Sequence, residues 1–129
     1  MRSATLMIVC MVLTIVAQAA GLAPRVTGFF SDMRYNKEGG DVLGTEVHIV
    51  FSQDKHHAVI QCAEGAPGVP VVVPVAVSGA EIEFEVPDQR ETLCCPGKFR
   101  GTVSKDALRG KFDTCHDKLV LKRRQSYWR

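Results

Sequence analysis

The sequence predicts an all-β fold, a small eight-stranded antiparallel up-and-down barrel, with a β-sandwich as the alternative. Short stretches in which apolar and polar residues alternate recur at intervals of about 8–14 residues. Tight polar turns separate several of these stretches, and no long segment has apolar residues at helical spacing. A sheet of this size with one apolar face must close on itself or pack against a second sheet, and closure removes the exposed edges.

Residues 1–19 have the pattern of a secretory signal peptide. A positive charge precedes the apolar run 6–16, and Ala17-Gln18-Ala19 offers the small residues that a signal peptidase reads. The run is about half as long as the roughly 20 residues that a membrane-spanning helix needs. No later segment is long and apolar enough to span a membrane. We therefore expect a single β-barrel domain over residues 20–129 and a periplasmic or secreted location.

The charge balance argues against nucleic acid as a partner. The 129 residues include 16 Lys+Arg and 14 Asp+Glu, which gives a formal net charge of +2. Binding to a nucleic-acid backbone depends on neutralising several phosphates with a basic surface. A chain so close to neutral lacks a strong positive field, so we expect no nucleic-acid partner.

The expected strands follow from the alternation. The clearest is 81–86, where Ile82, Phe84 and Val86 face one side and three glutamates face the other. A helix would scatter these residues around its circumference, whereas a strand sorts them onto two faces. The eight expected strands are 28–36, 44–52, 57–63, 69–77, 81–86, 98–104, 107–113 and 118–123.

Two pairs of residues disturb regular pairing in these strands. Pro70 and Pro74 lie in the fourth strand and cannot donate ladder hydrogen bonds, which predicts an edge strand or a break in its pairing. Gly101 and Gly110 lie at equal distances from the 104–106 turn and are expected to face each other. Two inward glycines let a sheet bend or let a large side chain cross over them, and simple curvature is the preferred interpretation.

Four cysteines lie in the expected domain, at Cys62, Cys94, Cys95 and Cys115. In an exported domain of this size an even number of cysteines is typical of a disulfide framework. Ring strain disfavours a bond between the adjacent Cys94 and Cys95. We expect Cys62 to bond one member of this pair and Cys115 to bond the other, with both alternatives open. The spacing fits neither a zinc site nor a redox motif, so neither is expected.

In a meander the connections between strands alternate between the two ends of the barrel. The tight turns 52–55, 78–80 and 104–106 then share one rim. All four cysteines fall on the other rim, which we call the long-loop rim and take as the expected binding surface, because binding residues often lie on loops held by a rigid scaffold. Its connections are 37–43, 64–68, 87–97 and 114–117.

The candidate binding residues on the long-loop rim are Glu38, Asp41 and His116. Glu38 and Asp41 flank a Gly-Gly turn, and His116 follows Cys115. No pair of nucleophile and base and no metal shell emerges from the sequence. We therefore expect no enzymatic activity, no metal and no cofactor.

The other histidines and the acidic stripe of residues 81, 83 and 85 are interpreted as solvated surface. His48 alternates with Glu46 on an exposed strand face, and His56-His57 lies beside a turn. Three carboxylates on one strand lack the convergent loop geometry of a calcium site.

The C-terminal segment combines cations with aromatic residues. Tyr127 and Trp128 follow Lys122-Arg123-Arg124. Since large aromatic side chains bury favourably, we expect both to fold back over a barrel opening or seam and to leave the arginines in water.

Several segments resemble a group of small exported bacterial β-barrel proteins. The resemblance rests on residues 40–47, 99–103, 108–110 and 121–128 and covers most of the expected domain. It implies an exported barrel and no particular activity. The architecture also resembles lipocalins, although Gly28-Phe29-Phe30 stands where their Gly-x-Trp signature would be.

Two functions fit these expectations. The first is an exported non-catalytic binding protein that holds a small apolar ligand or an envelope component at its long-loop rim. The alternative is a periplasmic or secreted protein inhibitor or immunity-like factor that binds a protein partner through the same rim or through the acidic stripe.

Overall fold

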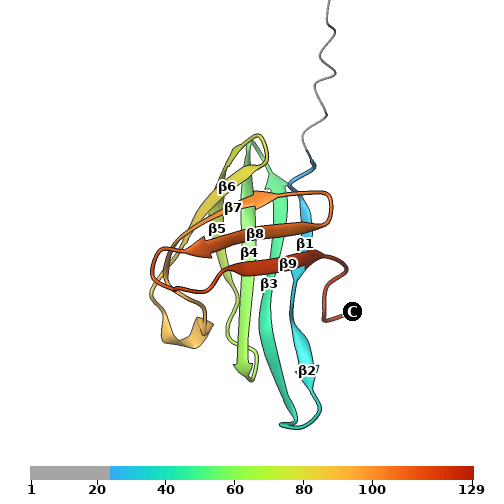
Figure 1. Cartoon of the computed structure of the whole chain (residues 1–129). Coiled ribbons are helices and arrows are strands. Elements are labelled where there is room, and N and C mark those ends of the chain that lie inside the picture. The colour runs from blue at the N-terminus through green and yellow to red at the C-terminus, as the bar shows by residue number, and fades with distance from the viewer. Residues whose placement is uncertain (1–23) are drawn as a thin grey trace, which may run out of the picture.

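The computed structural model describes residues 24–129, so the expected signal peptide at 1–19 lies outside the described residues. The described chain forms nine strands in one sheet, in the order β1-β9-β8-β7-β6-β5-β4-β3-β2, and a further pairing of β1 with β3 closes it. This is the predicted eight-stranded antiparallel barrel, in which β1 and β2 share the place of one strand (Figure 1). The strands are β1 (Gly28–Ser31), β2 (Arg34–Asn36), β3 (Asp41–Ser52), β4 (Lys55–Gly65), β5 (Val71–Ser78), β6 (Glu81–Val86), β7 (Gly97–Val103), β8 (Ala107–Phe112) and β9 (Leu119–Arg123).

The first expected strand, 28–36, is interrupted where Asp32 and Met33 leave the ladder. The Asp32 carboxylate accepts a hydrogen bond from the Thr45 N–H at 2.7 Å, and Met33 is fully buried. The interruption lies against Gly44, whose φ of +115° is a conformation that side-chain-bearing residues rarely adopt. A Cβ at Gly44 would also stand 2.8 Å from the Met33 Cα. The single strand expected here was therefore wrong, because local turn chemistry divides it into β1 and β2.

The barrel interior is filled with side chains. Three aromatic rings pack together inside it, with ring centroids 4.7 Å apart for Phe84 and Phe99 and 5.2 Å apart for Phe99 and Phe112. Burial of each large apolar side chain is worth roughly 1.5–3 kcal/mol. The rest of the core comes from the inward positions of all the long strands, among them Phe30, Val47, Ile49, Ala58, Ile60, Val73, Val75, Ile82, Val103, Leu108 and Leu121.

Gly101 and Gly110 face each other in the ladder of β7 and β8, as predicted. A Cβ on either glycine would stand 2.6 Å from the ring of Phe99, so this ring lies over both of them inside the barrel. The preferred interpretation, simple curvature, was therefore incomplete. The two glycines make room for a large side chain that bends back over its own strand.

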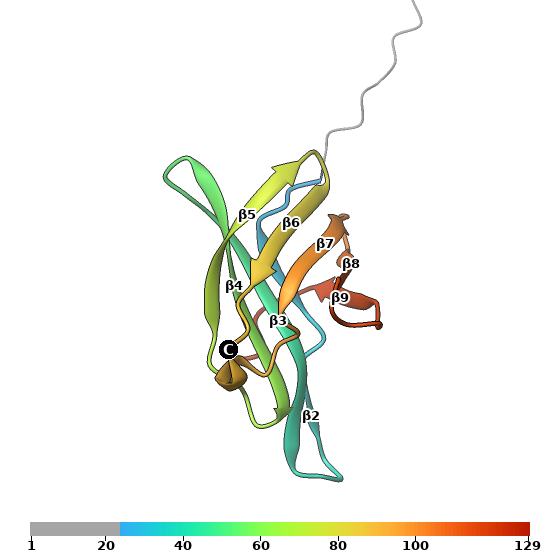
Figure 2. The same ribbon diagram turned by 90° about the vertical axis from the view of Figure 1, so that its left-hand side faces the viewer.

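The pairing of β5 breaks at Pro74 as predicted, whereas Pro70, expected in the same strand, lies before it. β5 pairs with β6 only from Ala76↔Glu83 to Ser78↔Glu81, and the two strands separate beyond that point (Figure 2). In a hairpin with a two-residue turn, every second pair from the turn exchanges hydrogen bonds. If the ladder continued in this register, Pro74 and Glu85 would form the next pair that exchanges hydrogen bonds. Proline has no N–H to donate there, so the ladder ends.

Two disulfides tie the long-loop rim together. Cys62 bonds Cys94 and Cys95 bonds Cys115, with Cα–Cα distances of 5.3 and 6.3 Å. The expectation that the adjacent cysteines take separate partners is confirmed. The first bond joins the end of β4 to the connection that carries a short 3-10 turn (Arg90–Thr92), and the second joins that connection to the one between β8 and β9.

Candidate functional site

The predicted rim residues do not form a site with one another. Glu38 is exposed in the β2–β3 turn, where its N–H donates to the side-chain oxygen of Asn36. Asp41 is half-buried at the start of β3, and His116 is exposed beyond Cys115. Among residues 24–129, no hydrogen bond or ion pair joins any two of Glu38, Asp41 and His116.

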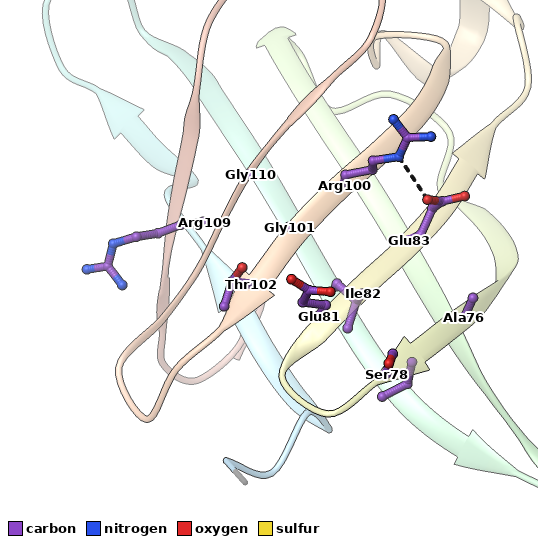
Figure 3. A pocket seen from close by; sticks show the side chains of 11 residues that line it. Ala76, Ser78, Glu81, Ile82, Glu83, Arg100, Gly101, Thr102, Arg109 and Gly110 are labelled. Carbon is purple, nitrogen blue, oxygen red and sulfur yellow. Dashed lines mark hydrogen bonds and ion pairs between the residues drawn. The ribbon is translucent and has the colours of Figure 1, made fainter.

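A groove with a volume of about 600 Å³ runs instead along the outer surface of β5, β6, β7 and β8 (Figure 3). We call it the β5–β8 groove. Its floor is the row Val77–Ile82–Gly101–Gly110, in which each residue is paired with the next across the sheet. The side chains in this row point into the barrel or are absent, so the groove exposes the backbone between two ridges of outward side chains.

Strand register assigns the two walls of the groove. One wall contains Ala76, Glu83 and Arg100, which are successive partners across β5, β6 and β7. The opposite wall is the row Ser78–Glu81–Thr102–Arg109. Both walls therefore carry one carboxylate and one guanidinium group.

The charges of the first wall neutralise each other. Glu83 accepts a hydrogen bond from Arg100 Nε at 2.9 Å, and its other oxygen lies 3.3 Å from Lys98 Nζ. The hydrogen bond from Arg100 lowers the pKa of Glu83, with a smaller lowering from Lys98, and the same bond raises the pKa of Arg100. Both groups thus stay ionised around neutral pH.

The charges of the second wall remain available to a ligand. Neither Glu81 nor Arg109 forms an ion pair with any other residue in the described part of the chain. Arg109 donates one hydrogen bond, from Nη1 to the hydroxyl of Ser104 at 3.3 Å. A partner with complementary charges can therefore bind to this wall without breaking an existing ion pair.

A second hollow of about 410 Å³ continues the groove towards the break between β5 and β6. It shares Ala76 and Glu83 with the groove and reaches Pro74, Phe84 and Glu85. The acidic stripe expected on β6 thus lies along both hollows, with Glu81 and Glu85 exposed and Glu83 neutralised by its two cationic partners.

The groove was missed because it depends on the register of four strands. The signal for it lay in the paired glycines and in the alternation of Glu81 and Glu83 with Arg100 and Thr102 in the next strand. Aligning the strands from the tight turns outward would have placed these residues side by side.

The C-terminal segment crosses the outer surface of the barrel and not its opening. It passes over the seam at β1, where the Arg124 N–H donates to the Phe29 carbonyl, and reaches β3 and β4. There Glu46, predicted to be exposed, is only 7% exposed because the segment covers it. Trp128, predicted to be buried, is 51% exposed. Its Nε1 donates a 2.8 Å hydrogen bond to the side-chain oxygen of Gln61.

The arginines expected in water are structural. Arg123 lies over the Phe30 ring, 4.5 Å from its centroid, and donates to the backbone carbonyls of Thr27 and Lys105. Burial lowers the pKa of Arg123. Arg124 donates to the Met33 carbonyl. Arg123 therefore links the end of β9 to the segment before β1, and Arg124 contacts the interruption between β1 and β2. Both contacts stabilise the closure of the barrel.

No group of three or more metal-ligating side chains occurs within residues 24–129. In the same part of the chain, no helix is long and apolar enough to cross a membrane. Comparisons with models of protein families, with curated proteins and with solved structures found no match. The resemblance to small exported bacterial proteins therefore stays a prediction, while the barrel itself is established.

Proposed function

We propose that this chain is an exported, non-catalytic factor that binds a protein partner, as an inhibitor or immunity-like protein does, and that the β5–β8 groove is its interface. The two disulfides support export, because such bonds persist in oxidising compartments. The observation that carries the proposal is the groove itself, an elongated outer hollow with free charges of both signs on one wall.

The packed interior favours a protein partner over a small apolar ligand. A barrel that holds such a ligand needs an internal cavity, and the interior of this one is packed with core side chains, among them Phe84, Phe99 and Phe112. The two hollows described above both lie on its outer surface. Recognition at an open groove of mixed charge is typical of protein surfaces, where electrostatic complementarity determines specificity.

The test compares two charge-exchange variants of the purified chain in capture from an envelope extract of the producing organism. The groove variant is Glu81→Lys with Arg109→Glu, and the rim variant is Lys37→Glu with Glu38→Lys. Both keep the net charge, and all four residues are exposed. We expect the groove variant to lose the partner and the rim variant to retain it.

Three other results would count against the proposal. Loss of the partner by the rim variant alone would move the interface to the long-loop rim. Equal capture by both variants would exclude the groove as the interface. Failure of the unchanged chain to capture any protein, together with a thermal shift on adding fatty acids, would favour a small apolar ligand.

A further inference from the structure

We propose that the outer wall formed by β1, β3, β4 and β5 is a surface on which two copies of this chain associate. This inference is independent of the proposed partner at the β5–β8 groove. It rests on the chemistry of the outward residues, which differs sharply between the two sides of the barrel.

Two rows of outward residues define this surface, which we call the neutral wall. Strand register aligns Phe29, His48, Val59 and Val72 in one row across the four strands. The next row is Val50–His57–Pro74. Val72 is 64% exposed, and neither row contains a carboxylate, ammonium or guanidinium group.

His48 adds no charge to the neutral wall at neutral pH. The His48 ring stacks on Phe29 with a centroid distance of 3.7 Å, and burial lowers its pKa below the ordinary value of 6.5. The carboxylate that acts on His48, Glu46, lies under the C-terminal segment at the edge of the wall, where Ser126 and Tyr127 donate hydrogen bonds to it.

The opposite side of the barrel is densely charged. Its outward positions on β6, β7, β8 and β9 are occupied mainly by ionised side chains, namely Glu81, Glu83, Glu85, Lys98, Arg100, Arg109, Lys111 and Lys122. Such residues keep a strand face in water. The barrel therefore has one face suited to solvent and one face that is not.

The sequence of β5 supports the same conclusion. A strand with one solvated face alternates apolar and polar residues, whereas a strand covered on both faces is apolar throughout. Residues 71–77 read Val-Val-Val-Pro-Val-Ala-Val. In this structure the inward Val73 and Val75 are buried, while the outward Val72 and Pro74 are exposed. The outer face of β5 thus has the composition of a covered face.

A second copy of the chain fits the neutral wall because a two-fold dimer brings identical surfaces together. Two charged walls placed face to face would set like charges against each other, which costs free energy. Two neutral walls bury Phe29, Val59 and Val72 of both copies without that penalty. The C-terminal segment contacts the wall at the Phe29 carbonyl, at Glu46 and at Gln61. Val72 remains 64% exposed, while Phe29 and Val59 are half-buried.

The experiment is sedimentation velocity on the purified chain over about a hundredfold range of concentration, since a dimer forms by mass action. We expect a reversible shift from monomer to dimer. Val72→Asp is expected to weaken dimerisation about tenfold or more, because it buries a charge in the interface. The matched control is Val120→Asp, at a 48% exposed outward valine on β9, which should leave the dimer unchanged.

Two outcomes would overturn the inference. One is a monomer at every concentration of the unchanged chain. The other is equal weakening by Val72→Asp and Val120→Asp, which would assign the effect to charge alone and not to the neutral wall. Since both substituted side chains are exposed, near-ultraviolet circular dichroism should stay unchanged and verifies folding. Partner capture by Val72→Asp tests the groove separately, because residue 72 lies outside it.

Discussion

The carboxylate of Glu46 accepts a hydrogen bond from the hydroxyl of Ser126 at 2.7 Å across 80 residues of sequence. Its second oxygen accepts the Tyr127 N–H at 2.8 Å. Two donors thus satisfy a carboxylate that is only 7% exposed. This pair of contacts fixes the C-terminal segment across the seam where β1 closes the barrel.

Replacing Glu46 by glutamine should loosen the C-terminal segment. The amide oxygen can still accept from the Tyr127 N–H, and the amide NH₂ can donate to the Ser126 hydroxyl oxygen, but both hydrogen bonds lose their ionised acceptor and become weaker. We expect a loss of about 1–2 kcal/mol in the free energy of unfolding, because hydrogen bonds to a charged acceptor stabilise more than neutral ones. Urea unfolding measures the loss, and fluorescence anisotropy of Trp128, the single tryptophan, should fall. Glu85→Gln is the control, and an equal effect there would contradict this role of Glu46.

Gly110→Ala should destabilise the barrel strongly. The added Cβ would stand 2.6 Å from both the Gly101 Cα and the Phe99 ring and still closer to the Arg100 carbonyl, with no flexible group able to yield. Overpacking of this kind costs about 1–3 kcal/mol and sometimes more. Thermal unfolding measures the change. Gly39→Ala, which meets mainly flexible side-chain ends in an exposed turn, should cost far less, and similar values for the two would refute the described packing of Phe99.

Removing either disulfide should lower stability substantially. The pairs Cys62–Cys94 and Cys95–Cys115 close loops with sequence separations of 32 and 20. Loop-closure entropy then predicts a loss of about 3–4 kcal/mol for each double replacement by alanine, with the larger loss for the longer loop. Denaturant unfolding of both variants measures this. An unchanged stability in one of them would show that its bond does not form.

Acidification should lower the free energy of unfolding, because His48 becomes protonated. Burial lowers its pKa in the folded chain, and the Glu46 carboxylate opposes this to a smaller extent. Neutral His48 therefore makes its full contribution to stability above pH 6.5, the ordinary pKa that His48 has in the unfolded chain. This contribution is lost as the pH falls from 6.5 to the lower pKa of His48 in the folded chain. Relative to His48→Gln, the unchanged chain should lose stability over this window. A difference that does not vary with pH would contradict the assignment, which a direct NMR titration of His48 can confirm.

Local patterns in the sequence predicted most of the barrel. Alternation places the strands, the tight turns determine which glycines face each other, and Pro74 ends the β5–β6 ladder where a donor is needed. These features depend on residues close in sequence. The absence of a bond between Cys94 and Cys95 also follows, because strain disfavours a bond between neighbours. The choice between the two remaining pairings did not follow from the sequence and comes from the structure.

Long-range contacts account for what the sequence did not reveal. The burial of Glu46 depends on a segment 80 residues away, and no local pattern reports such a contact. The β5–β8 groove requires the register of four strands at once, so its residues appeared as isolated surface charges. The predicted binding residues Glu38, Asp41 and His116 lie on loops, whereas the groove lies on the wall of the barrel.

Site-specific photo-cross-linking tests the location of the interface most directly. A photoreactive amino acid is placed at position 102, on the wall of the groove, and in a separate variant at position 38, on the long-loop rim. Both positions are exposed, so neither change disturbs the core. We predict a cross-link to the captured partner from position 102 and none from position 38. A cross-link from position 38 alone would contradict the account.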